Sequence, residues 1–224
     1  MIIKERNDVS KKWLEDQIRN LSKPDTGVEE FVEQNAFYNY ANENFQNIRD
    51  NVDMYGQMYN VLKEFQLKIK KEDTDSFNES LTAISKLQGI MQEIESKVEE
   101  KKERYKKTVA QLVPKLDNEI NEHYDKAQDP KYLDGSNMDK MFDIIQELND
   151  IEAQFKELEE RKDTYNKYQE VLETQQTVFE NLEDCREQIT LRCLMWNSLD
   201  EWSQMNEKWK KTQFSQVDAE TIEK

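Results

Sequence analysis

The side chains that most often carry chemistry are few in this chain and do not converge in the sequence. His123 is the only histidine, and the two cysteines, Cys185 and Cys193, lie eight residues apart in a stretch with helical periodicity. A zinc site needs a close group of cysteine and histidine ligands, and a disulfide needs two Cα atoms within about 7 Å of each other. We therefore expect a half-exposed histidine near a helix end, two reduced thiols and no metal site.

Motifs that bind phosphates or activate a nucleophile are absent as well. None of the four glycines begins Gly-x-x-x-x-Gly-Lys-[Ser/Thr] or Gly-x-Gly-x-x-Gly, and Gly-x-Ser-x-Gly does not occur. The chain has 48 aspartates and glutamates, so a carboxylate pair at any given spacing is expected by chance. The sequence predicts that this chain is not itself an enzyme and has no cofactor.

The formal net charge of −16 narrows the range of partners. Nucleic-acid binding needs a basic patch that neutralises phosphates, and an anionic membrane surface repels an acidic protein. No apolar run is long enough for a membrane-spanning helix, and the N-terminal residues lack the apolar core of a signal peptide. We therefore predict no nucleic-acid partner, no membrane partner and a cytoplasmic location.

The composition favours long helices over disorder. Charged residues make up 36% of the chain, which suits helices that bury one narrow stripe. The chain nevertheless has four tryptophans, nine tyrosines and nine phenylalanines, and disordered segments are usually poor in aromatic residues. With only four glycines and three prolines there are few places to turn, so the elements should be long.

Apolar residues recur at seven-residue steps, and two such rows three positions apart are typical of a coiled-coil seam. The first helix with this pattern, predicted over 28–70, carries Phe31, Tyr38, Phe45, Val52 and Tyr59 in one row and Ala41, Ile48, Tyr55, Leu62 and Ile69 in the other. Gly56 lies inside it and marks either a bend or a close helix crossing. The next helix, predicted to reach about Ala127 with a bend near Pro114, carries Phe77, Ile84, Met91, Val98, Tyr105 and Leu112.

Breaks in the pattern divide the chain. Turn-forming residues lie at 22–27 and 129–137 and a polar gap lies at 72–76, whereas the stretch 189–193 contains no firm helix breaker. We predict a short amphipathic helix over 1–24, a long helical hairpin over 25–130 and two further helices over 131–224. Consecutive long helices joined by short loops fold back on one another. The expected fold is all-α, an elongated antiparallel bundle of long helices with coiled-coil-like seams.

The last helix has the richest aromatic content, and we predict that its residues are structural or interaction residues. They are Trp196, Leu199, Trp202, Trp209 and Phe214. Aromatic residues at helical spacing most often lie in a core. If Trp202 and Trp209 are both buried, their replacement by alanine should cost several kcal/mol.

One region resembles a known family. It begins with Leu191-Arg192-Cys193-Leu194-Met195-Trp196-Asn197-Ser198-Leu199-Asp200-Glu201-Trp202 and continues with Trp209, Phe214 and Val217-Asp218-Ala219-Glu220-Thr221-Ile222. This pattern resembles the stretch of dynein heavy chains just before the linker. The preceding helix, with Phe155, Leu158, Arg161-Lys162, Tyr165 and Tyr168, is also similar. The resemblance covers about 110–224, whereas 1–110 match only as a generic helical tail.

Two family features are missing, a Gly-Pro-Met tripeptide in the loop and a Gly-Glu-x-Leu-Phe-Gly-Leu segment, where this chain has residues 171–176 instead. This departure bears on the subclass of heavy chain. The resemblance implies an excerpt of an axonemal-type heavy-chain tail that is stiff and couples the tail to the linker. It also implies partners, namely intermediate and light chains, other heavy chains, the rest of the same chain and, through the complex, the doublet microtubule. The implied location is the cytoskeleton of the ciliary axoneme.

Two other classes of protein compete with this interpretation. The first is a free-standing helical scaffold like spectrin or plakin, which would show repeats of near-constant length, and none is found. The second is a curved membrane-binding helical dimer, which needs a basic concave face and fits poorly with the net charge.

Overall fold

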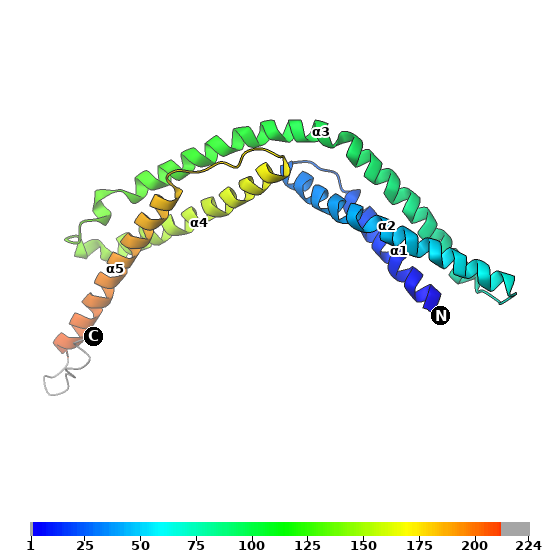
Figure 1. The fold of residues 1–224 in the computed structure, drawn as a ribbon. Coiled ribbons are helices and arrows are strands. Elements are labelled where there is room, and N and C mark those ends of the chain that lie inside the picture. The colour runs from blue at the N-terminus through cyan, green and yellow to red at the C-terminus, as the bar shows by residue number, and fades with distance from the viewer. Residues whose placement is uncertain (1, 212–224) are drawn as a thin grey trace. The chain divides into compact units, whose positions relative to one another are not determined.

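A computed structural model describes residues 2–211, which are almost entirely helical. The α-helices are α1 (Ile2–Leu21), α2 (Val28–Glu64), α3 (Lys71–Ala127), α4 (Met141–Val171) and α5 (Leu182–Lys211), and two short 3-10 helices, η1 (Pro130–Tyr132) and η2 (Met138–Lys140), lie between α3 and α4 (Figure 1). No strand occurs in this part of the chain. The all-α prediction is confirmed. Among these helices none is long and apolar enough to cross a bilayer.

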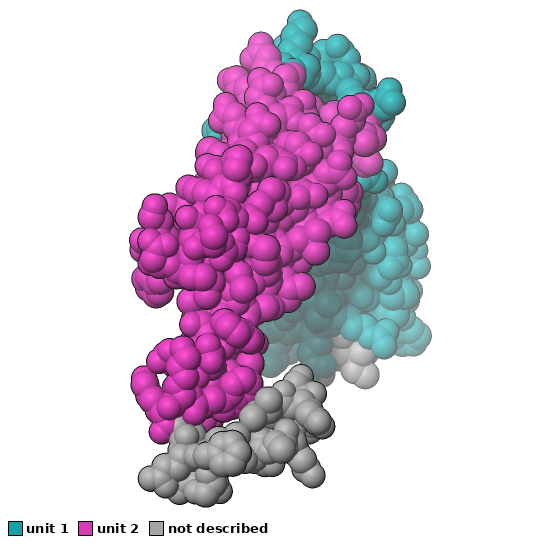
Figure 2. Space-filling model, turned by 90° about the vertical axis from the view of Figure 1, so that its left-hand side faces the viewer, with its two compact units in different colours: residues 1–110, 168–175 teal, residues 111–167, 176–224 magenta. Residues whose placement is uncertain are grey.

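Packing divides the chain into two compact units, which Figure 2 distinguishes by colour. Unit 1 comprises residues 1–110 and 168–175, and unit 2 comprises 111–167 and 176–224. Helix α3 contributes residues to both units. We predicted the boundaries at residues 24 and 130 from loop-forming sequences, whereas the two units are defined by contacts between residues. The predicted boundaries therefore stay a prediction.

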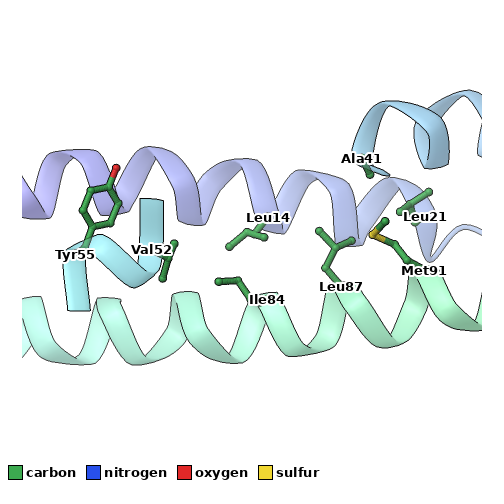
Figure 3. Packing of buried hydrophobic residues seen from close by; sticks show 8 residues of the cluster. All are labelled: Leu14, Leu21, Ala41, Val52, Tyr55, Ile84, Leu87 and Met91. Atoms are coloured by element: carbon green, nitrogen blue, oxygen red, sulfur yellow. The ribbon is translucent and has the colours of Figure 1, made fainter. Parts of the chain in front are cut away.

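The core of unit 1 lies between α1, α2 and α3. Leu14 of α1 and Ile84 of α3 point toward each other between their helices (Figure 3). The other members of the cluster are Leu21, Ala41, Val52, Tyr55, Leu87 and Met91. Five of these eight residues belong to the seven-spaced rows, namely Ala41, Val52, Tyr55, Ile84 and Met91. The heptad pattern therefore identified the buried faces of both helices correctly.

The core of unit 2 is formed by the second part of α3 with α4 and α5. Its buried apolar side chains include Leu116, Ile120, Ile144, Leu148, Phe155, Leu158, Ile189 and Trp196. Polar contacts tie the same helices together. The Arg161 guanidinium donates to the Glu119 carboxylate at 3.1 Å, and the Asn181 amide donates to Asn121 at 2.8 Å. Pro114 lies inside α3, which continues to Ala127 as predicted.

Helix α2 ends earlier than the sequence predicts, and α4 ends with the same geometry. Helix α2 stops at Glu64 instead of continuing to residue 70. Gln66 has φ 53°, its N–H donates to the Lys63 carbonyl, and the Leu67 N–H donates to the Leu62 carbonyl, each at 2.9 Å. This pair of bonds is a Schellman motif, which ends a helix through one left-handed residue.

The end of α4 repeats this arrangement. Glu173 has φ 55°, and the Thr174 N–H donates to the Gln169 carbonyl at 2.9 Å. Residues 172–181 therefore separate α4 from α5, and the segment 189–193 lies within α5.

The polar segment 72–76 is helical rather than a gap, because α3 already begins at Lys71. Glu72 and Asp73 lie in its first turn, where the partial positive charge of the helix N-terminus favours carboxylates. Residues 72–76, which indicated a break, therefore form the first turns of α3.

Gly56 marks a close helix crossing. A Cβ atom at this position would lie 2.9 Å from Cζ of Phe77, whose ring packs against Tyr59 with centroids 5.4 Å apart. A Cβ atom at Gly89, in contrast, would have open space around it, with no atom of a neighbouring side chain within 4 Å. The two glycines therefore differ in whether a methyl group fits.

We expect opposite outcomes from alanine at these two glycines. Gly89→Ala should raise the free energy of unfolding by about 1 kcal/mol, because alanine favours the helix and nothing obstructs its methyl group. Gly56→Ala should give no such gain, since the Phe77 ring has to move. Chemical denaturation of the two variants measures the difference. Equal stabilisation by both substitutions would contradict the close crossing.

Candidate functional site

The residues that carry chemistry are dispersed in the described part of the chain. It contains no cluster of three His, Cys, Asp or Glu side chains that could hold a metal ion. His123 links α3 to α4, because its Nδ1 lies 3.0 Å from the Glu119 carbonyl and its Nε2 lies 3.1 Å from Oε1 of Gln154. The candidate site is therefore the aromatic helix α5.

Both cysteines of α5 are free thiols. Burial raises the pKa of the Cys185 thiol to about 11, with a smaller contribution from the negative charge of Glu159. Burial also raises the pKa of Cys193. Since the thiolate is the reactive form, these groups are poor nucleophiles at neutral pH. Cys185 is fully buried and serves as a small apolar side chain in the core of unit 2.

Trp196 is the centre of the packing of α5. Its side chain is fully buried, and its indole N–H donates to the Tyr132 carbonyl in η1 at 2.9 Å. Tyr132 is itself buried, and its hydroxyl donates to Glu147 of α4 at 3.0 Å. A single tryptophan thus connects α5 to the segment between α3 and α4.

Arg192, one turn before Trp196, is a residue that sequence reasoning did not single out. It is 3% exposed, and its guanidinium donates to the Gln188 carbonyl at 2.9 Å and to Oε1 of Gln128 at 3.2 Å. Gln128 directly follows the last residue of α3. These acceptors offset part of the cost of burying this charge.

The remaining predicted residues of α5 are less buried. Leu199 and Trp209 are partly buried, Trp202 is 54% exposed, and Phe214 lies outside the described residues. The expected burial of Trp202 in this chain is wrong. At 3.6 residues per turn, Trp202 lies about 120° around the helix from Trp196, so the two rings do not share a face.

Helix α5 instead carries two apolar stripes. The inner stripe is buried and consists of Leu182, Cys185, Ile189 and Trp196, with the buried Arg192 on the same side of the helix. The outer face, on the opposite side, consists of Leu191, Leu194, Trp202 and Met205, which are 50%, 62%, 54% and 43% exposed. Scattered exposed apolar residues are ordinary, but a stripe of four at helical spacing is typical of a protein contact.

Unit 1 contains a group of polar side-chain contacts that the sequence did not predict. The Asp25 carboxylate, in the turn before α2, accepts from Lys101 Nζ at 2.9 Å and from the Tyr105 hydroxyl at 3.2 Å. The Gln34 amide donates to the carbonyls of Leu21 and Lys23, both at 3.1 Å. These bonds hold the turn against α3, which is a structural role.

We expect the Asp25 contact to make stability depend on pH. Burial alone raises the pKa of Asp25, but the hydrogen bond and charge of Lys101 outweigh it, so the pKa lies below its ordinary value. A lowered folded-state pKa contributes stability above the unfolded value of about 3.9, and that contribution is lost as pH falls through the folded value. The difference in free energy of unfolding between wild type and Asp25→Asn should therefore shrink below about pH 4. A constant difference in urea titrations from neutral to acid pH would contradict this role.

Two human proteins are similar to this chain over most of its length. Dynein axonemal heavy chain 6 (Homo sapiens) is 27% identical over 200 residues, which cover 88% of this chain and 5% of that protein. Dynein axonemal heavy chain 14 (Homo sapiens) is 21% identical over 238 residues, which cover 100% of this chain and 7% of that protein. The chain is homologous to axonemal dynein heavy chains.

The homology confirms the resemblance seen in α5 and extends it. The two matches cover 88% and 100% of the chain and therefore include much of unit 1. In that unit the sequence pattern alone resembled only a generic helical tail. No protein-family profile matches this chain. The chain spans 5% to 7% of the length of these two dynein relatives.

Proposed function

We propose that this chain is a non-catalytic segment of a dynein heavy-chain tail, located just before the linker, in an ATP-driven motor of the ciliary axoneme. The observation that carries the proposal is that nearly the whole helical chain matches a small part of two very long axonemal heavy chains. The dynein-like pattern in α5 supports a position near the linker. ATP hydrolysis then belongs to other parts of the heavy chain.

In this role the segment supplies stiffness and a point of attachment. Paired long helices resist bending because each buries its apolar stripe against a neighbour. Helix α5 contributes the coupling, with its inner stripe holding unit 2 and its outer face contacting the linker side of the same heavy chain. Intermediate and light chains, other heavy chains and, through the complex, the doublet microtubule are the further partners of the proposal.

The size of the native protein tests the first part of the proposal. An antibody raised against residues 140–210 is used on blots of ciliary and cytosolic extracts. We expect one band far above 26.9 kDa, the mass of this chain, enriched in cilia. A band near 26.9 kDa would replace the motor assignment with the free-standing scaffold.

Substitutions on the outer face of α5 test whether this face couples the segment to the linker. Trp202→Ser with Met205→Ser, introduced into the full heavy chain, should leave the unfolding of this segment nearly unchanged, since both side chains are exposed. It should increase protease cleavage between α5 and the linker, because the contact that covers this region is lost. Val178→Ser, at an 84% exposed valine of unit 2, is the matched control. Identical cleavage in wild type, variant and control would exclude the coupling role.

A further inference from the structure

The turn between α2 and α3 exposes apolar side chains that no described residue covers. Within unit 1, the segment 58–71 contains Met58, Val61, Phe65 and Leu67, which are 37%, 49%, 73% and 56% exposed. We call this segment the α2–α3 tip (Figure 1). Met58 and Val61 lie three residues apart on one side of α2, and Phe65, the residue directly after α2, follows Val61 by four. Four exposed large apolar groups within ten residues are unusual for a solvated turn.

The base of the tip is well packed, so the exposed groups are held in place. Tyr59 is 6% exposed and packs on Phe77, whose ring also fills the space beside Gly56. The Schellman bonds at Gln66 and Leu67 fix the turn itself. An apolar group held on a rigid base loses little conformational entropy when it binds.

The charge of the tip is opposite to that of the chain. Residues 65–71 contain Lys68, Lys70 and Lys71 and no acid, although the chain has a net charge of −16. All three lysines are exposed, and none lies within ion-pair distance of an acid in the described part of the chain. Exposed acids follow at Glu72 and Asp75, inside the first turns of α3. The basic charge is therefore concentrated at the turn.

The position of these lysines is locally unfavourable. Lys70 and Lys71 stand at the N-terminus of α3, where the helix dipole disfavours cations. A carboxylate placed beside them would interact favourably with both the lysines and the helix N-terminus. The apolar groups next to these lysines would gain from being covered.

We propose that the α2–α3 tip is a docking surface for an acidic protein segment whose apolar side chains cover Phe65 and Leu67 while its carboxylates face Lys68, Lys70 and Lys71. A protein partner suits the molecule better than a membrane, because the acidic body of the chain is repelled by anionic lipid. This surface lies in unit 1 and is separate from the outer face of α5.

The test uses the whole 224-residue chain and a fluorescent amphipathic helical peptide made of leucine, alanine and glutamate. Fluorescence anisotropy should show binding that weakens as salt is added, since exposed ion pairs are screened. Phe65→Ser with Leu67→Ser, and separately the triple variant Lys68→Glu, Lys70→Glu and Lys71→Glu, should each lower affinity roughly tenfold. Circular dichroism should show an unchanged unfolding midpoint for the serine variant and a midpoint that is not lowered for the glutamate variant, because all substituted groups are exposed and carboxylates are favoured at the N-terminus of α3.

Matched substitutions in unit 2 control for net charge and surface hydrophobicity. The charge control is Lys115→Glu with Lys140→Glu and Lys156→Glu, three exposed lysines outside ion pairs in the described chain. The apolar control is Phe142→Ser at a 78% exposed position. Unchanged affinity in both controls supports the proposal.

Three outcomes would overturn it. Equal losses in the control and tip variants would mean non-specific attraction. Binding of a peptide with lysine in place of glutamate would show that charge is not recognised. Absence of peptide binding, together with tip-dependent cosedimentation on phosphatidylserine vesicles, would assign the tip to a membrane surface instead.

Discussion

Replacement of Trp196 by alanine is expected to lower the free energy of unfolding of unit 2 by roughly 3–5 kcal/mol. The side chain is fully buried, and its removal leaves a cavity where α5 meets η1. The Tyr132 carbonyl also loses its donor, and a buried carbonyl without a partner adds to the cost. Urea denaturation followed by circular dichroism measures the loss.

Two variants separate the contributions to this effect. Trp196→Phe keeps an aromatic ring but not the N–H donor, so we expect an intermediate loss of about 1–3 kcal/mol. Trp202→Ala, at the exposed tryptophan of the same helix, should change stability by less than about 1 kcal/mol. A loss at Trp202 as large as that at Trp196 would contradict the placement of the outer face.

Leu14→Ala should have the largest effect in unit 1, a loss of about 2–5 kcal/mol. Leu14 is fully buried and faces Ile84 across the α1–α3 contact (Figure 3). Truncation removes apolar contacts from α1, α2 and α3 together, because the cluster includes residues of all three helices. Denaturant titration, with hydrogen exchange at the amides of α1, would show the destabilisation.

Val9→Ala is the matched control for this substitution. Val9 lies in the same helix and is 71% exposed, so its truncation should change stability by no more than about 0.5 kcal/mol. A large loss at Val9, or none at Leu14, would mean that α1 packs on unit 1 through another face.

The helices and their buried faces were largely readable from the sequence. The seven-residue rows placed Val52, Ile84 and Met91 in the core, and all three are buried. Such a row works because a helix buries a fixed stripe whatever its neighbour is. The ends of α2 and α4 were not readable, because Gln66 and Glu173 occupy the left-handed positions where glycine is the usual signal.

The candidate site was predicted in part. Trp196 is buried as expected, whereas Trp202 is exposed, and the sequence could not separate them because α5 has an apolar stripe on each side. The contacts of Arg192 and Asp25 join residues 64 and 76 positions apart, in Arg192–Gln128 and Asp25–Lys101. No local pattern reports such long-range pairs.

The sequence by itself determined that the chain is helical, which residues can form stripes, and that α5 is similar to dynein heavy chains. These properties depend on local periodicity and residue identity, which a single chain displays directly. The tertiary structure alone decided which stripe of α5 is buried, where the left-handed residues end helices, and which polar side chains meet. Those outcomes depend on neighbours distant in the sequence, because burial is a property of the whole packed unit and not of one helix.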